Sequence, residues 1–335
     1  MKNVLVAGGA GFLGSHLCER LLAMDCHVIC VDDFSTGRQE NIEALKASKQ
    51  FSVLCKDVSS DYDMNIVRMD SWRRGIKIDT IFNFASPASP VHYQADPIKT
   101  TMTNVMGTKL LLDVASSCGA VFVQASTSEV YGDPEQHPQR EEYRGAVNCT
   151  GPRSCYDEAK RMAESLCFDY RRCYKIDARV ARIFNTYGPR MQPDDGRVVS
   201  NFIVQALQGN DITVYGDGSQ TRSFCYVDDL IDGFIKLATL SSSEVSAGPF
   251  NLGNPYEITV LAFAELVLCR LAARNIDVNR VKIVHKKLPT DDPCRRKPDI
   301  SKAKEMLQWL PDTALERGLE QTIDHFVAVL KKGTQ

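Results

Sequence analysis

The sequence contains no apolar run that approaches the ~20 residues of a membrane-spanning helix, and it has no excess of either charge. Its 40 Lys and Arg residues are balanced by 42 Asp and Glu residues, which leaves a formal net charge of -2. Nucleic acids and anionic membranes attract proteins through a basic excess, so neither is expected as a general partner. An anionic small molecule would have to be held by a few placed arginines.

Spacings typical of metal ligands are also missing. The twelve cysteines are spread from Cys18 to Cys294 without a Cys-x-x-Cys pair, and several lie within apolar stretches. We therefore expect buried free thiols and no bound metal, rather than a disulfide scaffold. No charged segment followed by an apolar run precedes the first strand, so no secretory signal is expected and a cytoplasmic location is predicted.

Strand-like and helix-like patterns alternate through the first part of the chain. The apolar runs are Val4–Ala7, His27–Val31, Phe51–Leu54, Thr80–Phe84, Val121–Ala125 and Ala178–Phe184, and the helical patterns include Phe12–Met24, Pro97–Cys118 and Tyr156–Cys173. Buried Val/Ile/Phe runs that alternate with helices predict a parallel sheet covered on both faces. The fold class expected is α/β, with a Rossmann-like doubly wound parallel sheet.

The pattern changes after about residue 190. Turn-rich segments at 192–196, 216–218 and 251–256 alternate there with short strands and helices. We expect a smaller C-terminal α/β lobe over residues 191–330, packed tightly on a domain formed by residues 1–190, because no Pro/Ser-rich linker separates the two. Internal repeats and low-complexity tracts are missing from the sequence.

A glycine-rich turn follows the first strand and opens a helix. Gly8, Gly11 and Gly14 allow the turn to tighten and the backbone to approach a diphosphate, which then rests on the helix N-terminus. Asp32 ends the second strand, where a carboxylate accepts hydrogen bonds from a ribose 2'-hydroxyl and repels a 2'-phosphate. The pattern favours NAD over NADP, although Arg38 is close in sequence. The alternative is a tight turn followed by a surface aspartate.

A second group of residues indicates acid–base chemistry. Tyr156 and Lys160 share one face of a helix, and an ammonium beside a phenol lowers its pKa so that it acts as a base. This pair is common by chance, but it follows the strand that ends in Thr127, Ser128 and Glu129. Side chains at the carboxyl end of a parallel strand point into the ligand crevice.

Taken together, these motifs resemble the extended short-chain dehydrogenase/reductase family over almost the whole chain, and within it the UDP-glucuronate decarboxylases. The matching stretches are Gly8–His16, Val31–Arg38, Ala85–Pro90, Ala125–Pro134, Gly151–Lys160, Ala181–Arg190, Gly196–Gly209, Val214–Arg222 and Asp291–Ile300. The later ones extend the match into the second lobe, which makes it more specific than the superfamily motifs alone. The resemblance implies an NAD-binding domain at 1–190 and a lobe at 191–330 that mainly binds a nucleotide sugar.

The residues after the strand at 121–125 separate three groups of relatives. In the 4,6-dehydratases an aspartate that protonates the departing C6 hydroxyl stands in the place of Ser128. The 4-epimerases usually lack Glu129, because they need no proton transfer at C5. The triplet Thr127-Ser128-Glu129 resembles the decarboxylases. A nucleotide-sugar 4-epimerase or 4,6-dehydratase and a non-catalytic NAD-binding regulator remain as alternatives.

The resemblance implies conversion of UDP-glucuronate to UDP-xylose. Tyr156, aided by Lys160 and Thr127, would take the 4-hydroxyl proton as hydride passes from C4 to NAD⁺. The resulting β-keto acid loses carbon dioxide, and Glu129, with a water and Arg222, helps protonate C5. Return of the hydride to C4 explains a redox cofactor in a net non-redox reaction.

The same resemblance assigns residues to each ligand. Catalytic residues are Thr127, Ser128, Glu129, Tyr156 and Lys160. Cofactor-binding residues are Gly8, Gly11, Phe12, Leu13, Gly14, Asp32, Asp33, Phe34, Thr36, Gly37, Asp57, Val58, Phe84, Ser86, Thr103, Tyr156, Lys160 and Thr186. Substrate-binding residues are Glu129, Asn185, Val199, Ser200, Tyr215, Gln220, Arg222 and Arg296. A homodimer is implied, through the helices around Pro97–Cys118 and Tyr156–Cys173.

One position departs from this pattern. Met102 stands where the decarboxylases usually carry a lysine. If that lysine meets the substrate carboxylate or a phosphate, its loss is expected to weaken glucuronate binding or to change the sugar accepted, with Lys99 as the replacement cation.

Overall fold

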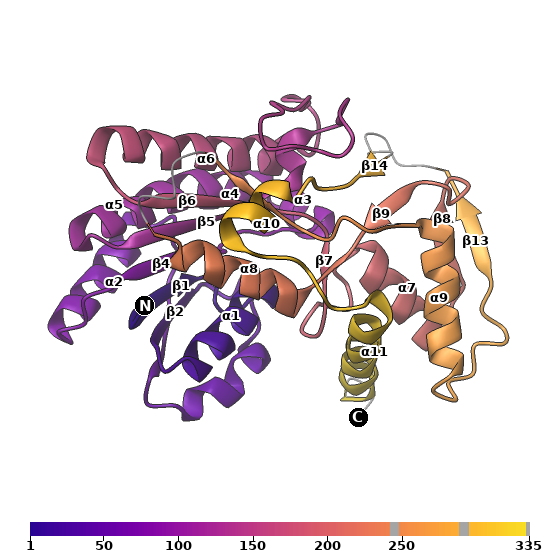
Figure 1. Cartoon of the computed structure of the whole chain (residues 1–335). Helices are drawn as coiled ribbons and strands as arrows, with labels where there is room; N and C mark the ends of the chain where they lie inside the picture. Colours follow the sequence, from indigo (N-terminus) through magenta and orange to yellow (C-terminus); the bar gives the residue numbers. More distant parts are fainter. Residues whose placement is uncertain (242–247, 288–294, 333–335) are drawn as a thin grey trace.

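A seven-stranded parallel sheet forms the centre of the molecule (Figure 1), in the order β11-β6-β5-β4-β1-β2-β3. The structure is a computed structural model, and it describes residues 1–241, 248–287 and 295–332. The strands are β1 (Asn3–Ala7), β2 (His27–Asp32), β3 (Phe51–Cys55), β4 (Thr80–Asn83), β5 (Val121–Thr127), β6 (Ala178–Ile183) and β11 (Phe250–Leu252). The Rossmann-like doubly wound sheet predicted from the sequence is confirmed.

Helices cover both faces of this sheet because its strands are apolar on both sides. One face packs against α2 (Asp61–Arg73), α5 (Thr108–Cys118) and α6 (Ser154–Tyr174), and the other against α1 (Phe12–Ala23) and α8 (Val227–Thr239). Alternate residues of β1 divide accordingly: Leu5 and Ala7 belong to the first core, and Val4 and Val6 to the second. The two cores are the layers expected of a doubly wound fold.

The helical pattern at Pro97–Cys118 is interrupted in the structure. It consists of α4 (Pro97–Met102), a π-helical stretch η3 (Thr103–Gly107) and α5. Such bulges are frequent at functional sites. Here the bulge brings Thr103 to the wall of a pocket beside β1 and β2. The short helix α3 (Pro90–Ala95) precedes α4.

The rest of the chain builds the second lobe. Its elements are β7 (Thr186–Tyr187), α7 (Val198–Leu207), β8 (Ile212–Tyr215), β9 (Thr221–Ser223), β10 (Cys225–Tyr226), β12 (Glu257–Thr259), α9 (Val260–Ala272), β13 (Ile283–Lys286), β14 (Arg295–Arg296), α10 (Ser301–Leu307) and α11 (Leu315–Lys332). Two segments after residue 190 return to the first domain: α8 covers the central sheet, and β11 pairs with β6. One apolar core therefore continues from the sheet into the second lobe.

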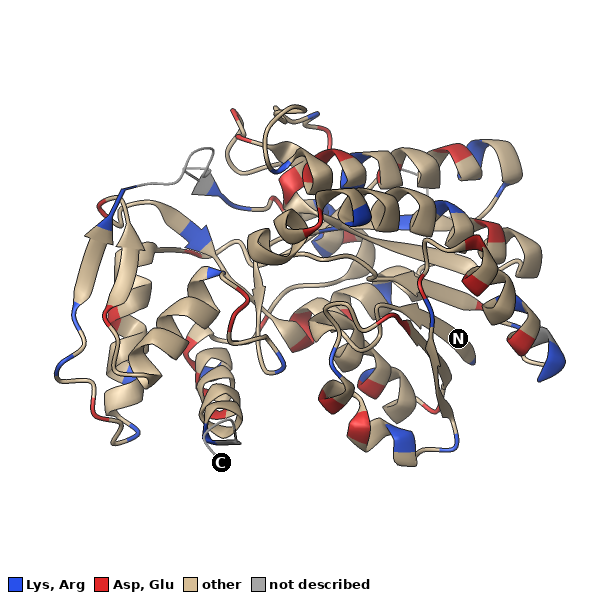
Figure 2. Ribbon diagram, turned by 180° about the vertical axis from the view of Figure 1, so that it is seen from behind, with Lys and Arg blue, Asp and Glu red and all other residues tan. Residues whose placement is uncertain are grey.

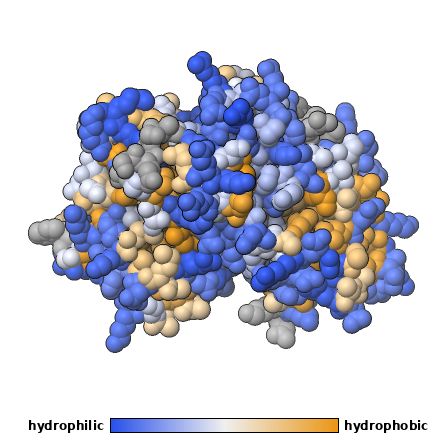
Figure 3. Space-filling model, viewed as in Figure 1, coloured by the Kyte–Doolittle hydropathy of each residue, from blue (hydrophilic) through white to orange (hydrophobic). Residues whose placement is uncertain are grey.

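Three short helical turns complete the first domain. They are η1 (Gln39–Asn41), η2 (Glu43–Ala47) and η4 (Ser128–Tyr131), and η4 follows β5 directly. Figure 2 shows the charges of both signs interleaved over the ribbon, and Figure 3 shows apolar residues set among hydrophilic ones on the face seen there. Among the described residues, no helix combines the length and apolar character needed to cross a membrane.

Candidate active site

The glycine-rich turn is built by close backbone approaches. Gly8, at the end of β1, has φ +75°, and a Cβ there would lie 2.7 Å from the backbone of Phe84 and Ala85. A Cβ at Gly14 would lie 2.1 Å from the carbonyl oxygen of Gly8, so glycine lets α1 start directly behind the turn. These are the two roles that a dinucleotide-binding turn requires of its glycines.

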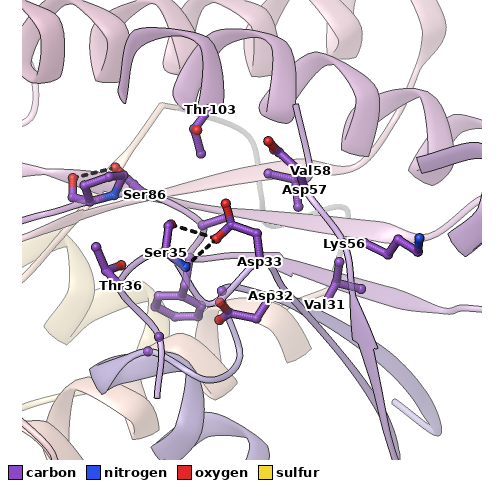
Figure 4. Close-up of a pocket in the computed structure, with 16 residues that line it drawn as sticks. Val31, Asp32, Asp33, Ser35, Thr36, Lys56, Asp57, Val58, Ser86 and Thr103 are labelled. Carbon is purple, nitrogen blue, oxygen red and sulfur yellow. Dashed lines mark hydrogen bonds between the residues drawn. The ribbon is translucent and has the colours of Figure 1, made fainter. Parts of the chain in front are cut away.

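A pocket opens beside this turn (Figure 4). The predicted cofactor residues that line it are Gly8, Gly11, Asp32, Asp33, Thr36, Gly37, Asp57, Val58, Phe84, Ser86 and Thr103. Phe12, Leu13, Gly14, Phe34, Tyr156, Lys160 and Thr186 are not among the lining residues. Val31, Ser35, Lys56, Ala85 and Pro87 line it without having been predicted. The pocket therefore gathers the carboxyl ends of β1, β2, β3 and β4.

Asp32 organises the base of the pocket. Its carboxylate accepts hydrogen bonds from the backbone N–H groups of Ala10 and Phe34, both at 2.9 Å. Burial raises the pKa of Asp32, while these two hydrogen bonds oppose the rise. The side chain thus connects the glycine-rich turn to the segment after β2. A dinucleotide with a free ribose 2'-hydroxyl fits this wall, since the hydroxyl can donate to a carboxylate.

Asp33 is engaged by a cation from another element. Lys99 of α4 donates to its carboxylate at 2.7 Å, and Ser35 donates twice, through its backbone N–H and its hydroxyl. Burial alone would raise the pKa of Asp33, but the hydrogen bonds from Lys99 and Ser35 prevail and lower it. The role of Lys99 as the replacement cation for a lysine at position 102 stays a prediction: its side chain is 40% exposed and pairs with Asp33 beside this pocket. The Met102 side chain is 44% exposed.

Tyr156 and Lys160 lie on one face of α6, as their spacing predicts. The Lys160 ammonium is 5.7 Å from the centre of the Tyr156 ring and donates to the carbonyl oxygen of Ala125 at 2.9 Å. Thr127 hydrogen-bonds the Tyr156 hydroxyl. The ring of Tyr93 stacks on Tyr156, with centroids 4.9 Å apart and planes at 6°. Residues of β5, α6 and α3 therefore surround the phenol of Tyr156.

The expected lowering of the Tyr156 pKa by Lys160 is not what this state shows. Burial raises the pKa of Tyr156, and the hydrogen bond from Thr127 only partly offsets this. Burial also lowers the pKa of Lys160 to about 7, against the opposing charge of Glu164. Burial therefore dominates the pKa of both groups, in opposite directions.

Glu129 is clamped by two arginines. Arg153, at the start of α6, donates to its carboxylate, and Arg296 of β14 donates with both terminal nitrogens. Burial alone would raise the pKa of Glu129, but the charges of Arg296 and Arg153 outweigh it and hold the pKa below its usual value. Glu129 is therefore an anion that connects η4 to the second lobe.

The two arginines predicted for the substrate are neighbours across a strand pair. Arg222 of β9 is in register with Arg296 of β14, and its Nη1 donates to the carbonyl oxygen of Thr221 at 2.9 Å. Arg296 is buried and directed at Glu129 rather than at an open surface. The assignment of Arg296 to the substrate stays a prediction.

The other predicted substrate residues occupy two places. Tyr215 and Gln220 lie together at the end of β8, where the Gln220 side chain donates to the Tyr215 carbonyl at 2.7 Å. Val199 and Ser200 are buried in α7, and the Ser200 hydroxyl donates to the carbonyl of Arg197. Asn185 is half-buried directly after β6.

Four residues near Tyr156 and Glu129 were not predicted from the sequence. They are Tyr93, Arg153, Asp157 and Arg197. Arg153 and Asp157 belong to the matched stretch Gly151–Lys160, and their i, i+4 spacing on α6 was the available signal. Tyr93 and Arg197 act through tertiary contact alone. The charge of Arg197, which pairs with Asp195, reaches Tyr156. No group of three potential metal ligands occurs among the described residues.

Comparisons with known proteins agree with this geometry. The profile of the NAD dependent epimerase/dehydratase family matches residues 4–253. UDP-glucuronic acid decarboxylase 1 from Arabidopsis thaliana is 48% identical over 324 residues, covering 97% of this chain and 69% of that protein. The protein of the same name from Danio rerio is 49% identical over 326 residues, covering 97% and 72%.

Solved structures share the fold at lower identity. UDP-glucuronic acid 4-epimerase from Bacillus cereus, in complex with UDP-glucuronic acid and NAD, superposes with a TM-score of 0.84 at 28% identity, over 98% of this chain and 99% of that one. The epimerase Mth375 from Methanothermobacter thermautotrophicus reaches a TM-score of 0.87 at 25% identity, over 99% and 94%.

Proposed function

The chain belongs to the NAD dependent epimerase/dehydratase family and, within it, groups with the UDP-glucuronic acid decarboxylases; from this premise we propose that it converts UDP-glucuronate to UDP-xylose and carbon dioxide. The enzyme is accordingly a carboxy-lyase. The observation that carries the proposal is the end of β5, where Thr127, Ser128 and Glu129 lie beside Tyr156. Ser128 is buried and cannot protonate a departing hydroxyl, whereas a carboxylate is present for proton transfer at C5.

NAD is the cofactor that the pocket residues support. The glycine turn can receive the diphosphate and Asp32 the ribose hydroxyls, and the predicted set of cofactor residues, including those outside the pocket wall, is proposed unchanged. When bound, NAD supplies hydride acceptance at C4 and hydride return. The division into an NAD-binding part at 1–190 and a mainly substrate-binding part at 191–330 is proposed with it.

The protein's own residues divide the remaining work. Tyr156 removes the 4-hydroxyl proton, with Thr127 hydrogen-bonded to its oxygen and Lys160 fixed beneath it by Ala125. Oxidation at C4 makes the sugar a β-keto acid, from which carbon dioxide leaves without an acid catalyst. Glu129, as an anion, then helps to pass a proton from solvent water to C5. Tyr156 returns its proton to the 4-oxygen as the ketone is reduced.

The nucleotide sugar spans the two lobes in this proposal. Its contacts are assigned to Asn185, Val199, Ser200, Tyr215, Gln220, Arg222 and Arg296, together with Glu129. A guanidinium fork suits phosphate oxygens, and this role is assigned to Arg222 and Arg296 together; in the ligand-free structure the fork of Arg296 meets Glu129. Glucuronate binding has to proceed without a lysine at position 102.

We infer that the enzyme is a homodimer in the cytoplasm. Ile98 of α4 and Met162 of α6 are 74% and 50% exposed, and together with Met102 they place large apolar side chains on the two helices expected at the interface. The eleven described cysteines are all free, which supports a reducing compartment. Sedimentation of wild type against Ile98→Glu tests the dimer: a wild-type monomer would contradict it.

Incubation of the purified protein with UDP-glucuronate and NAD⁺ tests the reaction. Carbon dioxide and UDP-xylose are expected, and Tyr156→Phe is expected to lose about 10²–10⁴-fold in turnover because the base is gone. An epimerised hexuronate without carbon dioxide would establish the 4-epimerase alternative instead. Unchanged turnover in Tyr156→Phe would refute the role of the phenol.

A further inference from the structure

A small three-stranded sheet carries the two arginines assigned to the nucleotide diphosphate. In this sheet β9 lies between β12 and β14, and Arg222 of β9 is in register with Arg296 of β14. Like charges at paired positions of neighbouring strands repel each other. The strand β14 spans just Arg295–Arg296, so its ladder with β9 is short. The alignment of the two guanidinium groups therefore depends on contacts from outside that ladder.

Glu257 of β12 supplies two of these contacts. Its Oε1 accepts a hydrogen bond from the Thr221 hydroxyl at 2.6 Å, and its Oε2 lies 3.3 Å from Nζ of Lys297. Thr221 directly precedes Arg222 in the chain, and Lys297 directly follows Arg296. One carboxylate therefore connects the sequence neighbours of both arginines.

Glu257 lies on the face of this sheet that is turned away from the arginines. Side chains alternate along a strand, so Thr221 and Arg222 project to opposite faces. The Glu257 carboxylate contacts the Thr221 side chain, whereas the fork of Arg296 meets Glu129. Glu257 can therefore influence a ligand of the arginines through the strands, without touching it.

The segment between η4 and α6 meets the same place from the first domain. Nε2 of His137 lies 3.4 Å from Oε2 of Glu257. Gln139, which is 1% exposed, donates its backbone N–H to the Lys297 carbonyl at 2.9 Å and accepts from the Lys297 N–H through its side chain at 2.8 Å. Glu257 and the first domain thus hold one residue, Lys297, from two sides.

The charge of Glu257 is maintained by its partners. Burial alone would raise the pKa of Glu257, but the hydrogen bonds from Thr221 and Lys297 prevail and lower it. The carboxylate is 21% exposed and the Lys297 side chain 31%. Partly exposed ion pairs contribute little to global stability. Removal of the carboxylate is therefore expected to disturb the alignment of β9 and β14 and to leave the protein folded.

We propose that Glu257 is a positioning residue that aligns Arg222 and Arg296 for the diphosphate of the nucleotide sugar. The inference rests on the proposed assignment of the diphosphate to these two arginines. Two guanidinium groups bind a diphosphate together when their separation matches its oxygens. Because a small misplacement of binding groups lowers affinity steeply, the residue that fixes this separation helps to set the affinity for the substrate.

Calorimetric titration of the NAD-loaded enzyme with UDP and with UMP measures this alignment. Glu257→Ala is expected to weaken UDP binding by about tenfold, and UMP binding by about threefold or less, because UMP has one phosphate for the arginines to hold. The KM for UDP-glucuronate should rise in proportion to the Kd for UDP. The kcat should stay within about twofold, since Tyr156 and Lys160 lie on another element. The affinity for NAD should not change.

Three further variants separate the contacts. Glu257→Gln keeps an acceptor for Thr221 and should recover part of the UDP affinity. Lys297→Met should weaken UDP binding in the same direction, and the double variant of Glu257→Ala with Lys297→Met should lose no more than Glu257→Ala alone, because both changes remove one ion pair. Glu265→Gln is the control: Glu265 is an exposed glutamate of α9, the helix that follows β12, and its loss should leave every constant unchanged.

The outcomes distinguish the positioning role from the proposed reaction. Wild type that binds UDP but forms no carbon dioxide removes the decarboxylation, and the UDP affinities still decide on Glu257. Unchanged UDP affinity in Glu257→Ala, or an equal loss for UDP and NAD, would overturn the positioning role. Wild type that does not bind UDP removes the assignment of the arginines and this inference with it. Should Glu257→Ala fail to fold, Lys297→Met decides, and unchanged UDP affinity there counts against the proposal.

Discussion

Replacing Arg182 with methionine is expected to destabilise the enzyme strongly, through a buried ion pair below the catalytic residues. Arg182 donates to Glu164 at 3.0 and 2.8 Å, and the two side chains are only 12% and 9% exposed. Ser126 also donates to Glu164, and Tyr131 accepts from Arg182. Arg182→Met leaves the Glu164 carboxylate buried, with the Ser126 hydroxyl as its remaining donor among the described residues.

The expected loss follows from that uncompensated charge. Removing one partner of a buried pair costs about 3–5 kcal/mol, a large part of the roughly 5–15 kcal/mol that stabilise a typical domain. Glu164→Leu should cost a similar amount, since it leaves the guanidinium of Arg182 unpaired. The double variant replaces both charges by apolar groups, so it is expected to be more stable than either single variant by about 1–3 kcal/mol.

Urea unfolding of the ligand-free enzyme, followed by far-ultraviolet circular dichroism, measures all three changes. With an m-value near 3 kcal/mol/M, Arg182→Met should lower the midpoint by roughly 1–2 M. Arg172→Met is the control: Arg172 is an exposed arginine of α6 paired with Asp169, and its loss should cost under about 1 kcal/mol. A loss as small for Arg182→Met, or strictly additive effects in the double variant, would refute the reasoning.

Three further changes test the cofactor turn and the catalytic lysine. Asp32→Asn is expected to weaken NAD binding by about 1–3 kcal/mol in calorimetry, because a charged acceptor of two backbone hydrogen bonds is lost; unchanged affinity would contradict this. Gly14→Ala should lower the free energy of unfolding by at least about 1–3 kcal/mol, and the melting temperature with it, since its Cβ would meet the backbone of Gly8. The control Gly75→Ala, at a surface glycine with open space around it, should cost about 1 kcal/mol or less. Lys160→Met should stabilise the ligand-free protein, and most strongly below pH 7. The folded state lowers the pKa of Lys160 to about 7, so the lysine binds its proton more weakly in the folded than in the unfolded protein. Wild type therefore gains stability as the pH rises above about 7, and the difference between variant and wild type shrinks. A pH-independent difference in melting temperature would exclude that explanation.

The backbone of the first domain was predictable because its signals are local. Each strand of the central sheet except β11 was expected within one or two residues of its bounds, since buried parallel strands read as continuous apolar runs. β11 escaped because Phe250–Leu252 is short and its assignment to the sheet depends on pairing with β6. The bulge at η3 also escaped. Gly107 marks it, where a Cβ would lie 2.8 Å from a methyl group of Val58, but a glycine inside a helical pattern does not specify π geometry.

In the site, the range of an interaction decided what the sequence could predict. The pairing of Tyr156 with Lys160 follows from one turn of helix, and the glycine turn from a strand and a helix adjacent in sequence. Arg296 and Glu129 are 167 residues apart, so no periodicity could reveal that their side chains form an ion pair. The pairing of Lys99 with Asp33, 66 residues apart, was likewise beyond sequence periodicity. Sequence identified which residues carry charge near the site; only the fold determines which opposite charge each one meets. That distinction governs the chemistry, because Arg296 and Arg153 keep Glu129 ionised, and the charge of Glu129, together with burial, raises the pKa of its neighbour Asp157.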